Sequence, residues 1–227
     1  MAYDQQRHRA LVQSAAVNYE FWRGTIQDQS SRGLAMSFVG APTFGRVNGH
    51  PCLKQNATGE GCTSGAVLGV VDMAASWTIE TLHRQDVGDS WLCRWAGPAS
   101  AGGFLQSNFA AGGRILVYEY DAAGVPQRQL FSPAGGVTPP NKTLHTLTSS
   151  IAAGTSGRMW FNGIPQVVTL IGAGVPVNPV ASPVGFGMSG GAGGLATEMI
   201  LRVYPFALTN EDATCLAEAA KELVGGW

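Results

Sequence analysis

Short apolar runs, separated by clusters of Gly, Pro, Asn and Ser, recur along almost the whole chain. Some of them alternate apolar and polar residues, as in Val17–Phe21, which is typical of a strand with one buried face. Many short strands with turn residues between them predict an all-β sandwich or barrel. The runs are 17–21, 34–40, 76–82, 90–96, 103–110, 114–121, 127–132, 142–151, 157–161, 165–172, 183–190 and 198–206.

The pair Asn162-Gly163 is the clearest turn signal in the chain. A two-residue type I′ turn needs positive φ at both central residues, which Asn and Gly tolerate, so the pair predicts a hairpin. On its first arm Met159 and Phe161 share one face, and Arg158 and Trp160 share the other. If the first pair faces the core, Trp160 points outward, where it either contacts a ligand or is covered by another part of the chain.

A helical period appears near the C-terminal end of the chain. Apolar residues between 213 and 224 recur at helical spacing, Thr209 and Asp212 stand in capping-box positions, and Gly225 ends the pattern. We therefore expect one C-terminal helix over 210–224, lying on the sandwich. Residues 1–16 are rich in helix formers and predict a short helix or arm. We expect this N-terminal arm to be mobile in the isolated chain and to precede a single domain at 17–227.

The charge balance excludes several classes of partner. Only 13% of the residues are charged, the net charge is −1, and no basic run occurs, so binding to nucleic acid is not expected. No apolar stretch is long enough for a membrane span. The polar N-terminus has no secretory signal pattern, so we expect synthesis in a cytoplasm.

The four cysteines show no C-x-x-C spacing, so neither a zinc site nor redox chemistry is indicated. Cys52 and Cys62 flank a polar loop, and whether they form a disulfide stays open at this point. We expect no cofactor.

Several motifs, taken in order, resemble the laminin-G-like branch of the concanavalin A-like lectin and glucanase superfamily. They are "DQSSRG" at 28–33, "SWTIETLHR" at 76–84, "GRMWFNGIPQ" at 157–166 and "ILRVYPFALTNEDATCLA" at 200–217. The resemblance implies a jelly roll of two antiparallel sheets that binds carbohydrate or protein, with catalysis in some branches only.

The closing strand departs from the pattern of these relatives. They often carry an acidic residue there that supports a structural calcium, but this chain has Met199 and Ile200 at those places, and Glu198 is shifted by one. A shift of one residue turns a strand side chain to the opposite face. We therefore expect no metal, although a calcium ion near Asp28 stays open.

Glucanases of this superfamily carry Glu-x-Asp-x-Glu on one strand, which aims several carboxylates at one bond. The nearest approach here is Glu119-Tyr120-Asp121, followed by two alanines, so the third carboxylate is missing. We expect no enzymatic activity and nominate no catalytic residue.

Strand alternation nominates residues for binding instead. Tyr118 and Tyr120 share one face of their strand. In the run 90–96, Trp91, Cys93 and Trp95 are expected on one face and Arg94 on the other. Trp77 and Ile79 are expected in the core, which leaves Glu80 on the outer side. The candidate ligand-binding residues are Trp160, Arg158, Tyr118, Tyr120, Arg94 and Glu80.

A domain that resembles extracellular modules, on a chain without a signal pattern, fits a bacteriophage virion protein made in the host cytoplasm. We expect a capsid decoration, head fibre or tail subunit that docks on other virion proteins through its N-terminal arm, forms a homo-oligomer or assembly, and binds surface glycan or protein. The alternative is a cellular carbohydrate-binding protein, extracellular, and exported by a non-classical route or cut from a longer chain.

Overall fold

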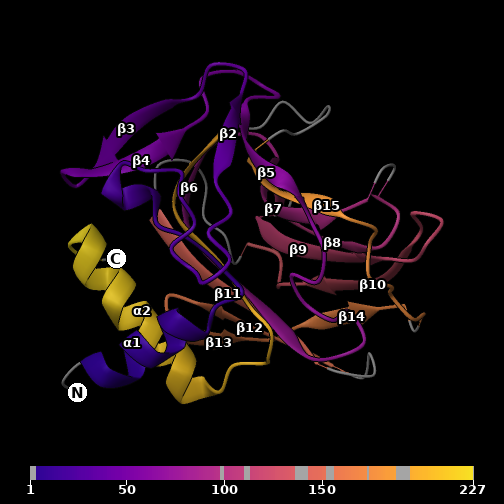
Figure 1. Ribbon diagram of the computed structural model, residues 1–227. Coiled ribbons are helices and arrows are strands. Elements are labelled where there is room, and N and C mark those ends of the chain that lie inside the picture. Colours follow the sequence, from indigo (N-terminus) through magenta and orange to yellow (C-terminus); the bar gives the residue numbers. More distant parts are fainter. Residues whose placement is uncertain are drawn as a thin grey trace.

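The computed structural model describes residues 4–97, 100–109, 113–135, 143–151, 156–172, 174–187 and 195–226. Within them, two antiparallel sheets of eight strands pack face to face, and two α-helices lie against one of the sheets (Figure 1). This is the predicted jelly-roll sandwich with a C-terminal helix. Packing sheet on sheet buries the apolar face that alternation marks on each strand.

The first sheet, called sheet A, carries both helices on its outer face. Its order is β13 (Ile164–Gln166), β12 (Gly157–Phe161), β11 (Thr143–Ser150), β6 (Trp77–Val87), β16 (Leu195–Tyr204), β4 (His50–Lys54) and β3 (Thr43–Val47), and β1 (Val17–Tyr19) also pairs with β16. The one-turn helix η1 (Phe21–Arg23) follows β1. Sheet B has the order β14 (Thr169–Ile171), β10 (Pro126–Phe131), β9 (Arg114–Tyr120), β8 (Gly103–Phe109), β7 (Ser90–Ala96), β15 (Ser182–Gly187), β5 (Gly61–Val67) and β2 (Met36–Val39).

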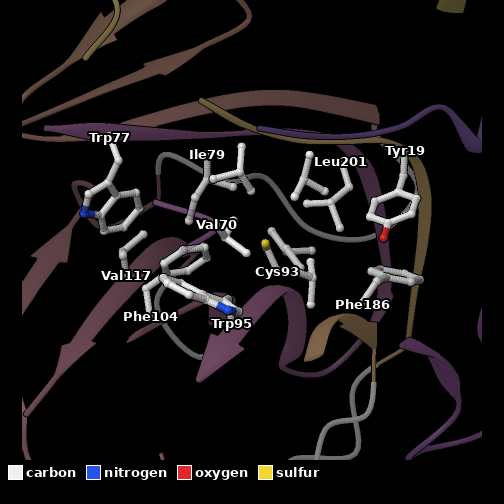
Figure 2. Close-up of a cluster of buried hydrophobic side chains, with 14 of the residues drawn as sticks. Tyr19, Val70, Trp77, Ile79, Cys93, Trp95, Phe104, Val117, Phe186 and Leu201 are labelled. Carbon is white, nitrogen blue, oxygen red and sulfur yellow. The ribbon is translucent and has the colours of Figure 1, made fainter. Parts of the chain in front are cut away.

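Large side chains from both sheets interlock in the core (Figure 2). Trp77 of sheet A stacks on Phe104 of sheet B, with ring centroids 4.6 Å apart. Trp95 tilts against the same phenylalanine at 6.0 Å. All three rings are fully buried, so the sandwich has a rigid centre that leaves only the outer faces and the edges for binding.

Both Asn-Gly pairs of the chain form tight hairpins. Asn162 and Gly163 have φ of 51° and 79° and join β12 to β13, which confirms the predicted turn. Asn48 and Gly49 have φ of 48° and 84° and join β3 to β4. That second hairpin and the following β5 were absent from the sequence-based strands, although Asn48-Gly49 carries the same signal.

Helix α2 (Asn210–Val224) agrees with the predicted bounds. Thr209 accepts a hydrogen bond from the backbone of Asp212 and completes a capping box, and Gly225 closes the helix with φ of 76°. Three of its six buried residues are alanines, which let the helix approach sheet A closely. At Gly163 of the β12–β13 hairpin, an added Cβ would lie 3.0 Å from the Cβ of Ala217, so the turn and the helix are in direct contact.

Helix α1 (Gln5–Ser14) corrects the expectation of a mobile arm. Its Leu11 is buried in the same cluster as Trp160 and Leu216. Arg7 donates from Nε and Nη2 to one oxygen of Asp212, at 2.9 and 2.7 Å. The helix forms as predicted, but its apolar side is covered by its own chain, whereas residues 1–3 lie outside the described residues.

Deletion of residues 1–14 should therefore lower the melting temperature. The truncation removes the Arg7–Asp212 contact and the burial of Leu11, and the burial of Leu11 alone stabilises the fold by about 2–3 kcal/mol. For a chain of this size that corresponds to a fall of about 5–10 °C. Thermal melting of the full-length and the truncated protein measures this fall. An unchanged melting temperature would mean that the domain folds independently of the arm.

Two questions left open by the sequence concern Cys52 and Asp28. None of the four cysteines, all at described positions, is in a disulfide, and Cys52 and Cys62 lie in different sheets.

Asp28 organises its turn. Its Oδ1 accepts hydrogen bonds from the backbone N–H groups of Asn18 and Ser30, and its Oδ2 accepts hydrogen bonds from the Ser30 hydroxyl and the Leu34 N–H. The carboxylate thus has a structural role that explains the turn motif.

The other acidic residue weighed for calcium lies in the interior. Glu198 is fully buried, and neither carboxylate oxygen has a hydrogen-bond partner among the described residues. Burial raises its pKa well above the usual range.

Neither described helix has the length and apolar composition that crossing a membrane requires.

Candidate functional site

The outer face of sheet B brings together three of the sequence-predicted binding residues, Arg94, Tyr118 and Tyr120. Leu105 on β8 is paired directly with Arg94 on β7 and with Tyr118 on β9, so these residues share one face. Both described helices lie on the sheet A side, so no helix of the described residues covers this face (Figure 1). The full row across the sheet is Ser37, Thr63, Gly185, Arg94, Leu105, Tyr118, Gln129 and Ile171.

A β-bulge in β7 adds Trp91 to this face. The register of β7 against β8 shifts between Trp91 and Cys93, which places Trp91 on the same side as Arg94. The Arg94 guanidinium lies over the indole, 5.2 Å from its centroid. The expectation that Trp91 shares a face with Cys93 and Trp95 is wrong, because strict alternation fails at the bulge.

The Arg94 guanidinium has few partners. Among the described residues it makes one long hydrogen bond, 3.5 Å from Nη2 to the Gly97 carbonyl, and it forms no ion pair. Its side chain is half-buried against the face. A cation held this way keeps several N–H donors for an incoming acceptor.

A pocket of about 250 Å³ opens beside this cation. Gly185 contributes no side chain between Arg94 and Thr63, which leaves room between the strands. Arg94 is the one charged residue among the described residues that line it. The walls include Thr63, Trp91, Arg94, Gly97, Ser182 and Gly185.

Two stacked tyrosines continue the face. The rings of Tyr118 and Tyr120 lie 6.3 Å apart and nearly parallel. Burial raises the pKa of Tyr118, and Asp89 raises it further; burial also raises the pKa of Tyr120, against a lowering by Ser100 and Arg94. Both phenols are therefore neutral at pH 7. Tyr118 is half-exposed, whereas Tyr120 is 8% exposed and supports its neighbour.

Trp160 is not placed to contact a ligand from the solvent. Met159 and Phe161 point into the sandwich as predicted, and Trp160 points out of it, but α2 covers the indole. The side chain is 1% exposed, and its Nε1–H donates to Asn210 at 3.0 Å. Trp160 is thus a packing residue, which is the alternative that the sequence left open.

Arg158 and Glu80 are also on sheet A, away from the Arg94 pocket. Arg158 is exposed and donates to the Leu208 carbonyl at 3.3 Å. Glu80 is on the outer side, opposite Trp77, as predicted, but it is fully buried. Neither residue joins the cluster on sheet B.

Glu80 is the centre of a buried ion-pair network. Arg202 donates to both of its oxygens at 3.1 Å, His145 lies 2.9 Å away, and Tyr204 donates at 2.5 Å. Burial alone would raise the pKa of Glu80, but the positive charge of Arg202 and the hydrogen bonds lower it to about 2. Arg202 also donates to Glu20 at 2.7 Å, so these charged residues pair with one another and stabilise the fold.

A larger cavity, of about 740 Å³, lies between α1, α2 and sheet A. Its charged residues include Arg23 and Arg202, and both are already paired with Glu20. Arg9 and Glu222 also line this cavity, and both are exposed.

The acidic pair considered for hydrolysis is separated in the fold. Glu119 faces the interior, where it pairs with Arg128, and burial raises its pKa. Asp121 accepts hydrogen bonds from the backbone of Ala123 and Val125 in the β9–β10 turn. The two carboxylates therefore do not converge on one exposed point.

No family model and no curated protein matches this chain. Solved structures do. The botulinum neurotoxin serotype D ligand binding domain, in complex with N-acetylneuraminic acid, has a TM-score of 0.73 and 11% identity, over 94% of this chain and 52% of that one. The serotype C/D mosaic receptor binding domain gives 0.70 and 12%, over 91% and 51%, and the serotype G binding domain gives 0.69 and 14%, over 91% and 51%.

These similarities establish a fold class, the lectin-like jelly-roll sandwich. The chain spans about half the length of the toxin domains it matches, so their binding properties belong to larger proteins.

Proposed function

We propose that this protein is a non-catalytic carbohydrate-binding domain whose site is the outer face of sheet B. The observation that carries the proposal is the cluster of Trp91, Arg94 and Tyr118, half-buried on a face that the described helices leave open. Aromatic rings provide apolar surface for the faces of sugar rings, and polar groups beside them fix orientation. The fold is shared with toxin domains named for receptor binding, one of them in complex with a sugar.

Replacing Trp91 or Tyr118 by Ala should reduce glycan binding at least about tenfold, because truncating a central aromatic contact typically removes 2 kcal/mol or more. A glycan array on the wild type identifies a ligand, and titration of that ligand into each variant measures the loss. Phe38→Ala is the matched control, since Phe38 is an exposed aromatic residue on edge strand β2. Equal affinities for all four proteins would contradict the proposal.

The non-catalytic part of the proposal is supported by the inward ion pair of Glu119 and the turn position of Asp121. Incubation with β-glucans should release no reducing sugar. Release that disappears in Glu119→Gln would reverse this assignment.

A virion location is a separate proposal, supported by the low share of charged residues, 13%, which suits a subunit packed in an assembly, and by the resemblance to extracellular modules. The apolar side of α1 is packed within the chain, so attachment to other virion proteins would use another surface. Co-sedimentation with purified phage particles tests the location, and absence from the particles would favour the extracellular alternative.

A further inference from the structure

We propose that the pocket beside Arg94 binds the carboxylate group of an acidic sugar, and that Arg94 makes the chain prefer acidic over neutral glycans. This inference rests on the proposed carbohydrate-binding function and specifies its ligand class.

The first argument is the state of the Arg94 side chain. Its guanidinium is half-buried, has one 3.5 Å hydrogen bond, and forms no ion pair with any described residue. The two fully buried arginines among the described residues are both paired: Arg128 binds Glu119, and Arg202 binds Glu20 and Glu80. Arg94 is therefore the half-buried cation of the site that still lacks its anion.

The second argument is geometric. The guanidinium is a planar fork that matches a carboxylate through two parallel hydrogen bonds. Its position over Trp91, 5.2 Å from the ring centroid, holds that plane in place. A preorganised fork loses little side-chain freedom on binding, so it discriminates sharply between a carboxylate and a hydroxymethyl group.

The third argument is the lining of the pocket. No acidic side chain is among the described residues that form it, so an anion meets no repulsion there. Thr63 and backbone groups around Gly97 and Gly185 supply polar atoms for hydroxyl groups. The volume of about 250 Å³ suits one sugar unit, with the rest of a glycan extending over the face toward Tyr118.

The test compares two ligands that differ only at one carbon: methyl β-glucuronide, which carries a carboxylate, and methyl β-glucoside, which does not. NMR titrations of the wild type should give at least about tenfold tighter binding of the glucuronide. Arg94→Gln should abolish this preference, because it weakens binding of the glucuronide at least about tenfold more than binding of the glucoside. Arg94→Lys should keep only part of the preference, because an ammonium group is a point charge without the fork.

Arg46→Gln is the matched control, since Arg46 is an exposed arginine on β3 of sheet A. Equal affinity for both sugars, tighter binding of glucose 6-sulfate than of the glucuronide, or the same loss in Arg94→Gln and Arg46→Gln would overturn the inference. The proposed function fails separately, when Trp91→Ala and Tyr118→Ala leave array binding unchanged. In a further outcome, the array shows binding of neutral glycans, and this binding is lost in Trp91→Ala and Tyr118→Ala but not in Arg94→Gln. The proposed function then stands, and only the acidic preference is wrong.

Discussion

Trp160→Ala should lower the melting temperature by about 10 °C or more, with no direct effect on glycan binding. Removing a fully buried Trp costs about 3–5 kcal/mol, because the cavity left behind closes only in part. The indole fills the space between β12 and α2, and its hydrogen bond to Asn210 ties it to the first turn of the helix.

Thermal melting and glycan titration, both measured below the transition of the variant, separate the two roles. Trp160→Phe is the milder control, since it keeps most of the apolar volume and loses only the Nε1–H. A variant with wild-type melting temperature and lost binding would return Trp160 to the list of ligand contacts.

Arg202→Met should destabilise the fold by about 3–5 kcal/mol, because it leaves the fully buried carboxylate of Glu80 without its arginine and removes one of the two arginines that pair with Glu20. Both Glu80 and Glu20 contact this guanidinium, and Glu80 is fully buried. Methionine approximates the length of the side chain, so loss of volume contributes little.

The size of this loss should depend on pH. In the wild type the pKa of Glu80 is lowered to about 2, below an unfolded value near 4.3, so its stabilising contribution is present above about pH 4 and disappears as the pH falls toward 2. Without Arg202, burial raises that pKa instead, and stability falls as the pH rises above about 4. The deficit of the variant should therefore be larger at pH 7 than at pH 4.

Unfolding in denaturant at pH 4 and pH 7 measures this difference. Adding Glu80→Gln to Arg202→Met should recover part of the loss at pH 7, because the uncompensated charge is removed. A deficit that is the same at both pH values would mean that packing, and not charge, dominates at this site.

Local signals predicted those elements whose structure is decided locally. The capping box at Thr209 and the stop at Gly225 fixed α2, and Asn162-Gly163 fixed the β12–β13 hairpin. The hairpin at Asn48-Gly49 was within reach of the same rule and was missed, since the flanking strands contain Gly45 and Pro51, which weaken the strand pattern.

Features that depend on distant partners were not accessible in this way. The run 165–172 appeared as one strand, but β13 belongs to sheet A and β14 to sheet B, and no property of the run itself marks the crossing between sheets. The pattern around Trp160 correctly separated it from Met159 and Phe161, yet it could not show that α2 covers the outward face.

The candidate site was predicted in part. Arg94, Tyr118 and Tyr120 came together because residues paired across neighbouring strands share a face, although the pairing itself was unknown from the sequence. Trp91 was placed on the wrong side, because the bulge that turns it arises from the register with β8. A bulge of this kind leaves no clear mark in an apolar run such as 90–96.

Because both helices lie on sheet A, the two outer faces of the sandwich differ in their distance from the ends of the chain. Helix α1 begins and helix α2 ends on that side, away from the outer face of sheet B (Figure 1). A tether, tag or fusion partner joined at either end is therefore held behind the Arg94 pocket, so an immobilised layer of this protein presents its pocket to the solution. Attachment through the edge of β2 or β14 would instead lay the same face sideways, and orientation on a surface thus becomes a variable that an experimenter can set.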